Sequence, residues 1–240
     1  MSDLVSMKNI SSSFILLLFL STLALSGQGV AYSVEMYVAD TKAGAARGDM
    51  RSQVILGIMY ETGFGMSPDP AKAFEWFLAA ANRDDSSGQF LVGRAYADGR
   101  GVPPDDGEAL VWFRKGAQSA LRGFSNDPTA ILFGFVDGVE GAIKEAERGN
   151  VMLQSIVGEM YLTGHGVEQS DAQAARWLAL AGTDGLLALM YEEGRGGLPK
   201  DKAEAMRRYR KAAEGEAATT KSTLTFFCAV TGRADCWRTR

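Results

Sequence analysis

The feature that most constrains this chain is its internal self-similarity. Three stretches, beginning at Gln53, Gln89 and Gln154, align without a gap, and a divergent fourth begins at Leu186. Each stretch carries one aligned tyrosine: Tyr60, Tyr96, Tyr161 and Tyr191. Repeats with a period of a few tens of residues are typical of solenoids, in which each unit buries its apolar face by stacking on its neighbours.

Each repeat predicts two antiparallel helices, and therefore an all-α fold. Leu56, Met59 and Tyr60 stand at helical spacing in the first helix, which ends at a Gly-x-Gly suited to a left-handed C-cap. One aligned position supplies the N-caps of the second helices: Asp69, Asp105, Ser170 and Asp201. The residues three positions further on predict capping boxes in three repeats: Glu108, Gln173 and Glu204.

A glycine also lies inside the first helix of three repeats, at Gly57, Gly93 and Gly158. Glycine in a helix interior costs about 1 kcal/mol relative to alanine, so a compensating close approach of the second helix is expected. The residues expected to face these glycines are Ala73, Ala109 and Ala174.

The repeat pattern resembles the Sel1-like repeat family, which is related to tetratricopeptide repeats. The best matching segments are LGIMYETGFGM with AFEWFLAAA, and VGRAYADGRGV with ALVWFRKGA. The resemblance covers about residues 45–117 and 146–213. It implies a right-handed α-solenoid of antiparallel helix pairs that acts as a scaffold or adaptor. Exported bacterial members of the family resemble envelope-signalling, secretion or host-interaction factors.

The N-terminus predicts export. Lys8 precedes an apolar run of 12 residues, Phe14–Leu25, whereas a membrane-spanning helix needs about 20. We therefore interpret residues 1–31 as a signal peptide and expect a periplasmic or secreted protein. The alternative is an uncleaved anchor, which would be the only route to membrane contact.

The rest of the chain is predicted to contain four segments. Residues 32–117 hold repeats 1 and 2, and residues 146–213 hold repeats 3 and 4. The 65-residue spacing between Tyr96 and Tyr161 leaves 118–145 as an inserted helix or degenerate repeat half, with Asn126-Asp127-Pro128 as its start. Residues 214–240 are expected to form a C-terminal capping helix over the last repeat.

The two cysteines, Cys228 and Cys236, are eight residues apart with Gly232 between them. In an exported protein such a pair predicts one disulfide that fixes the C-terminal tail. A metal site would need more ligands nearby.

The sequence offers little for catalysis. The only histidine, His165, lies in the Gly164–Gly166 turn and is expected to face solvent. We therefore expect no catalytic triad, no metal site, no cofactor and no enzymatic activity. A formal net charge of -4 without a basic face argues against nucleic-acid binding.

The leading functional hypothesis is a binding module in the bacterial envelope or outside the cell, whose concave face, lined by the first helices, holds another protein or peptide. Candidate contact positions are Glu61, Arg94, Asp98, Glu159 and Glu192. An envelope hydrolase or a protein that binds a small β-lactam-like ligand is the alternative, because some cysteine-rich relatives of the family have been discussed as β-lactam-binding. This chain lacks their pair of cysteines per repeat. A purely structural spacer is the third hypothesis.

Overall fold

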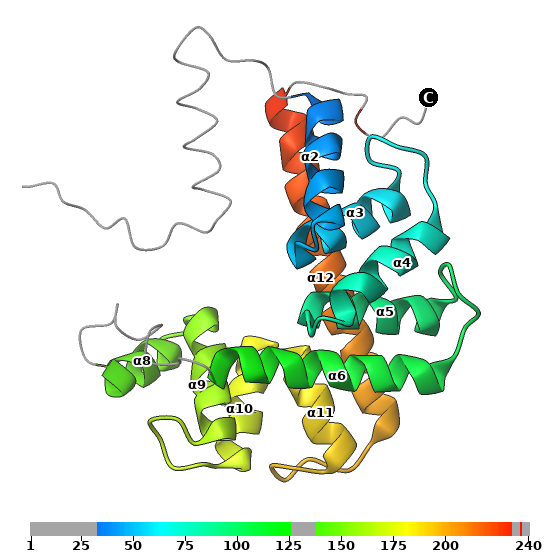
Figure 1. Ribbon diagram of the computed structural model, residues 1–240. Coiled ribbons are helices and arrows are strands. Elements are labelled where there is room, and N and C mark those ends of the chain that lie inside the picture. Colours follow the sequence, from blue (N-terminus) through cyan, green and yellow to red (C-terminus); the bar gives the residue numbers. More distant parts are fainter. Residues whose placement is uncertain (1–32, 126–137, 232–235, 237–240) are drawn as a thin grey trace, which may run out of the picture.

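The computed structural model describes residues 33–125, 138–231 and 236, and these residues are organised as α-helices (Figure 1). In chain order the helices are α2 (Val34–Ala46), α3 (Met50–Thr62), α4 (Pro70–Ala81), α5 (Ser86–Asp98), α6 (Asp106–Ser125), α8 (Gly138–Glu147), α9 (Val151–Thr163), α10 (Asp171–Ala181), α11 (Asp184–Glu193) and α12 (Lys202–Thr231). The predicted signal peptide and the predicted helix start at Asn126-Asp127-Pro128 lie outside the described residues. Within the described ranges, no helix has the length and apolar character needed to cross a bilayer.

Four helix pairs correspond to the four repeats: α3 with α4, α5 with α6, α9 with α10, and α11 with α12. The first helix of every pair ends at a glycine in the left-handed region, with φ between 69° and 79°: Gly63, Gly99, Gly164 and Gly194. A side chain is strained in that conformation, and the predicted glycine C-caps are therefore confirmed.

The turn inside each pair is closed by two sets of hydrogen bonds. The predicted N-cap side chains accept backbone N–H groups of the second helix's first turn, as Asp69 does from Lys72 (3.1 Å). The backbone N–H of each N-cap residue donates to the carbonyl of the aligned tyrosine, at 2.8–3.0 Å: Asp69 to Tyr60, Asp105 to Tyr96, Ser170 to Tyr161 and Asp201 to Tyr191. The capping boxes predicted from Glu108, Gln173 and Glu204 are therefore wrong, because the N–H group that a capping box needs is already taken.

The glycines inside the first helices do mark a close approach, but against larger side chains than predicted. A Cβ on Gly57 would lie 2.3 Å from the Phe77 ring, and one on Gly93 would lie 2.5 Å from the Phe113 ring. At Gly158 the nearest atoms belong to Leu178. The facing residue thus comes one helical turn after the expected alanine, and the missing Cβ makes room for a buried ring or isobutyl group.

Successive helix pairs are joined by a repeated glutamine. Each buried glutamine amide donates to a carbonyl at the end of the preceding helix: Gln53 to Ala45 (3.2 Å), Gln89 to Ala81 (3.2 Å) and Gln154 to Ala146 (3.0 Å). In repeat 4 the aligned residue is Asp184, which is buried and pairs with Arg208 (3.1 Å) and Lys211 (2.8 Å).

This joint also explains helix α8 in the segment between repeats 2 and 3. Ala146 in α8 receives the same bond from Gln154 that Ala81 in α4 receives from Gln89. The turn after α8 contains Gly149 at φ +96°, and the corresponding turn after α4 contains Asp84 at φ +63°. Helix α8 therefore occupies the position of a second helix of a repeat.

The repeats do not simply stack in sequence order. Helix α6 of repeat 2 packs against α11 of repeat 4, and the ring of Phe113 stacks on Tyr209 of α12 with centroids 5.6 Å apart. Repeats 2 and 4 thus share one apolar core, which includes Phe90 and Leu187 and extends to Leu178 of repeat 3.

Helix α12 is 30 residues long and belongs to more than one repeat. It begins as the second helix of repeat 4, then continues past α5 and α3 and ends beside α2 (Figure 1). The expected separate helix over 214–240 is instead continuous with residues 202–213 and lies across the first helices of repeats 1 and 2. The apolar side chains of Leu224 and Phe227 explain this course, because they join the core of repeat 1.

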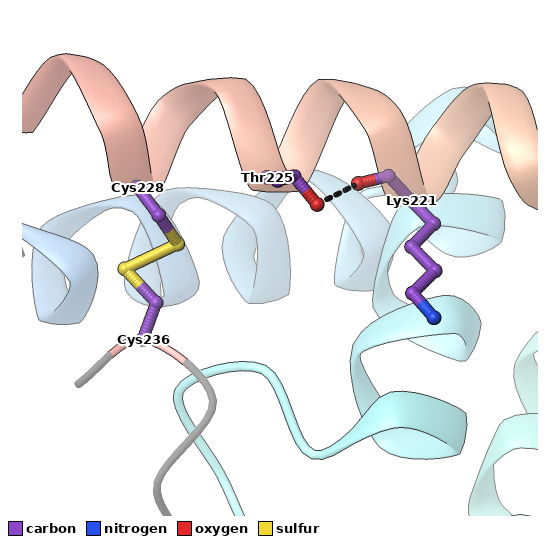
Figure 2. The surroundings of a disulfide bond; sticks show 4 residues. All are labelled: Lys221, Thr225, Cys228 and Cys236. Carbon is purple, nitrogen blue, oxygen red and sulfur yellow. Dashed lines mark hydrogen bonds between the residues drawn. A yellow bond between two sulfur atoms is a disulfide. The ribbon is translucent and has the colours of Figure 1, made fainter. Parts of the chain in front are cut away.

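The predicted disulfide between Cys228 and Cys236 is present, with Cα atoms 6.0 Å apart (Figure 2). Both cysteines are buried in the core of repeat 1. The carbonyl of Cys236 accepts the N–H of Gly65 at 3.0 Å. The end of α12 is thereby tied to the turn that follows α3.

Candidate partner-binding surface

Three of the five predicted contact residues lie in one cluster of charges. Glu61 of α3 accepts from Arg94 of α5 at 2.5 Å and from Arg100 at 3.0 Å. Arg100 also contacts Asp98 at 3.2 Å. The Arg94 side chain is only 9% exposed, whereas that of Arg100 is 53% exposed. The buried ion pair of the cluster therefore joins α3 to α5, and the guanidinium of Arg100 faces solvent.

A cavity of about 690 Å³ opens next to this cluster, between α3, α5 and α12. Its polar lining includes Glu61, Arg94, Arg100, Glu214 and Lys221. The α12 side of the cavity is formed largely by small side chains: Ala217, Ala218 and Thr225. Figure 2 shows Lys221 extending from the same side of α12 as Cys228, toward the helices of the first repeats.

A second cleft of about 350 Å³ borders the opposite flank of α12. It is lined on α12 by Thr219, Thr220, Thr223 and Leu224, and on the other side by residues of α2, α3 and the start of α5. At 100° per residue, these positions point away from the set that lines the larger cavity. Helix α12 therefore lies between two open spaces over the surface of repeats 1 and 2.

Glu192 is placed differently. It is 6% exposed and accepts from Arg114 of α6 (3.1 Å to Nε) and from the hydroxyl of Tyr209 (3.2 Å). Burial and the neighbouring Glu192 carboxylate raise the pKa of Tyr209, which stays protonated as a hydrogen-bond donor. Glu192 therefore joins repeat 4 to repeat 2, and its carboxylate is occupied by contacts within the chain.

Glu159 of α9 is mostly buried and has no cation within ion-pair distance among the described residues. Burial raises its pKa to about 7, and the hydrogen bond from Ser155 Oγ, at 3.2 Å, acts in the opposite direction. Near neutral pH its mostly buried side chain is therefore partly protonated rather than a fixed charge.

Sequence reasoning missed Arg100 and Lys221. Arg100 occupies the middle of the Gly-x-Gly turn, where the other repeats carry Phe64, His165 and Arg195, and this variability gave no signal. Lys221 was assigned to a terminal cap far from the first repeats. Lys221 of α12 and Arg100 of the turn after α5 therefore come to line the same cavity only through tertiary packing.

In repeats 1 and 3 the turn position is less exposed than expected. His165 is partly buried, and its Nδ1 is buried without a hydrogen-bond partner among the described residues. Phe64, at the same position in repeat 1, is fully buried beside Tyr37 and Phe227. His165 is therefore only partly exposed to solvent, because its turn lies against α8, where a Cβ added at the adjacent Gly166 would be 3.0 Å from Val139. Residues 33–125, 138–231 and 236 contain no group of three or more His, Cys, Asp or Glu placed to hold a metal ion.

The described helices define an all-α array of helix-pair repeats. The model of the Sel1 repeat family matches residues 51–85, 86–120, 153–186 and 185–216, together more than half of the chain. The chain belongs to the Sel1 repeat family, as its sequence predicted, and Sel1 repeat proteins generally bind other proteins.

Two solved structures are similar to this chain. One is a Sel1 repeat protein from Oxalobacter formigenes, with 23% identity, 85% of this chain and 86% of that chain covered, and a TM-score of 0.35. The other is c5321, a protective antigen present in uropathogenic Escherichia coli strains and displaying an SLR fold, with 27% identity and a TM-score of 0.38. That match covers 90% of this chain and 49% of the antigen, so this chain spans about half of the antigen's length. A comparison with curated proteins gives no match.

Proposed function

We propose that this protein is a non-catalytic scaffold that binds another protein through the first helices of repeats 1 and 2. The observation that carries the proposal is the 690 Å³ cavity between α3, α5 and α12. It combines an ion-pair cluster anchored in the fold with an exposed guanidinium and an exposed ammonium, on Arg100 and Lys221. Fixed charges beside an open apolar floor suit recognition of a protein segment.

We propose further that the chain is exported and acts in the bacterial envelope or outside the cell. Lys8 and the apolar run Phe14–Leu25 support export, and the Cys228–Cys236 disulfide supports an oxidising compartment. Cell fractionation with N-terminal sequencing of the product tests this part. Recovery of the full-length chain in the cytoplasm would refute it.

The binding proposal is tested by a photo-crosslinking amino acid placed at Thr62 of α3, which lines the cavity, in the full chain expressed in its host. Ala172 of α10, which is exposed on the other pair of repeats, is the matched control position. We expect one dominant protein adduct at position 62 and none of that adduct at 172. The adduct should be lost when Arg100 is replaced by glutamate. The same adducts at both positions, or an adduct insensitive to R100E, would refute this surface as the binding site.

A further inference from the structure

The two halves of α12 are held in the fold very differently. In residues 202–213, Ala205, Tyr209 and Ala213 are completely buried in the core that repeats 2 and 4 share with part of repeat 3. In residues 216–229, the buried side chains are Leu224, Phe227 and Cys228, which pack on repeat 1 and α2. The first half is thus part of a repeat, and the second half rests on the surface of other repeats.

The second half is gripped along one narrow stripe. Ala217, Leu224, Phe227 and Cys228 face the core of repeat 1, at spacings that fall on one side of a helix. The flanks of this stripe border the 690 Å³ and 350 Å³ spaces, where the side chains of α12 are mainly alanine and threonine. The segment therefore does not fill the groove in which it lies.

The helix itself is weakest where the two halves meet. Gly215 lies in its interior, and a Cβ added there would meet no atom within 4 Å, so packing does not require the glycine. Interior glycine disfavours helix by about 1 kcal/mol relative to alanine. Four threonines follow, and each hydroxyl donates back to a carbonyl four residues earlier: Thr219, Thr220, Thr223 and Thr225. Such bonds bend and weaken helices.

A few polar contacts keep the segment in place. Ser87 donates to Glu216 at 2.8 Å, near the junction with Gly215. At the other end, the disulfide links Cys228 to Cys236, whose carbonyl is bound by the N–H of Gly65. Among the described residues, the polar attachment is thus concentrated at the two ends of the segment, and the disulfide carries one of them.

We infer that residues 216–231 are an exchangeable occupant of the binding groove formed by α2, α3 and α5, and that a helix of the partner protein takes their place. Gly215 is the hinge about which the segment leaves. This inference rests on the proposed scaffold function and specifies its partner. Because a helix already occupies the groove, the partner segment is an amphipathic helix with apolar anchors in the spacing of Leu224, Phe227 and Cys228. Larger apolar side chains in the places of Ala217 and Ala218 would fill the 690 Å³ cavity and favour the partner.

Hydrogen exchange on the full chain tests the exchange itself, because the two halves of α12 serve as internal references. In Cys236→Ser, we expect amide exchange in residues 216–231 to become at least tenfold faster, with less than twofold change in 202–213. Reduction of the wild-type disulfide by dithiothreitol should give the same result without any substitution. Gly215→Ala should slow exchange in 216–231 several-fold. Equal changes in both halves, or no change in 216–231, would overturn the inference.

A peptide probe tests the partner chemistry. The probe is a helix-stabilised peptide of residues 214–231 with Cys228→Ser, and its matched form also carries Ala217→Leu and Ala218→Leu. Both are added to the Cys236→Ser chain, whose helicity is first checked by circular dichroism. We expect the leucine form to bind at least fivefold more tightly and to speed exchange in the chain's own 216–231 segment. Binding that leaves this segment protected, or no preference for leucine, would overturn the inference.

The two proposals can fail separately. If position 62 captures a protein while residues 216–231 stay protected, the exchange is refuted and the scaffold function stands. If the leucine peptide displaces the segment but position 62 captures no protein in cells, the scaffold proposal is refuted and the exchangeable groove stands.

Discussion

Repeats 1 and 2 and repeats 3 and 4 are built from the same helix pair but differ in the charge on their first helices. Two residues before the aligned tyrosine stand Arg94 in repeat 2 and Glu159 in repeat 3. Arg94 meets the carboxylate of Glu61 on the neighbouring repeat, whereas the partner of Glu159 among the described residues is the hydroxyl of Ser155. The residues that close the turns are similar in all repeats because the helix pair requires them. The position two residues before the tyrosine is not required in this way and can serve a different function in each repeat.

The largest effect is expected from breaking the pair in repeats 1 and 2. Glu61→Ala would leave the guanidinium of Arg94 buried without a carboxylate, which should lower the unfolding free energy by about 3 kcal/mol. Urea unfolding of the full chain at pH 7 measures this loss. Replacing both Glu61 and Arg94 with leucine should recover most of it, and a double variant as unstable as E61A would contradict this explanation.

A smaller effect should distinguish the close contacts of the two halves. Gly93→Ala pushes a methyl group against the rigid Phe113 ring and should cost about 2 kcal/mol. Gly158→Ala meets the Leu178 side chain, which can move in part, and the Leu178 backbone N at 3.1 Å, which cannot, and should cost about 1 to 1.5 kcal/mol. Thermal unfolding of the two variants side by side checks the order. Equal losses of unfolding free energy in the two variants would show that both helix pairs accommodate the added methyl group equally well.

Glu159 makes repeat 3 sensitive to pH. Its pKa is about 7 in the folded chain and near the ordinary 4.5 when unfolded, so the folded state holds the proton more tightly. Stability should therefore fall as pH rises from about 4.5 to 7 and stay lowered above pH 7. Glu159→Gln should raise the unfolding free energy by roughly 1 to 2 kcal/mol at pH 8 and leave it unchanged at pH 4. A variant with the same pH profile as the wild type would rule out Glu159 as the source.

The smallest expected effect lies in the helix that spans both halves. Gly215→Ala removes an interior glycine without creating a contact, and should raise the unfolding free energy by about 0.5 to 1 kcal/mol. Guanidinium unfolding measures the gain, with Gly107→Ala in the first turn of α6 as a control for a glycine outside a helix interior. A loss of stability in G215A would show that the helix must bend at this residue.

Local features of this fold could be predicted from the sequence, because they depend on residues a few positions apart. The glycine C-caps and the Asp or Ser N-caps are of this kind, and so is the disulfide between two cysteines eight residues apart. The family and the all-α helix pairs followed from them. The capping boxes failed because the tyrosine carbonyl, which belongs to another helix, competes for the same N–H group.

The arrangement of the repeats could not be predicted, because it depends on contacts between distant segments. Nothing in the sequence pattern indicates that Arg114 meets Glu192, 78 positions away, or that Tyr209 stacks on Phe113. The course of α12 follows from these contacts. The candidate site was therefore found only in part: Glu61, Arg94 and Asp98 were named in advance, whereas the α12 residues that complete the cavity were not.

The course of α12 also determines how the molecule can unfold. An open array of repeats, in which each unit touches only its neighbours, can melt from one end while the remainder stays folded. Here a single helix joins repeat 4 to repeats 1 and 2, and α6 contacts α11 as well, so among the described residues these three repeats all contact one another. Such a closed set of contacts favours one cooperative transition for the three repeats. A partner that removed residues 216–231 from the groove would break the contact between repeats 1 and 4, and repeat 1 would then be an end that can melt separately.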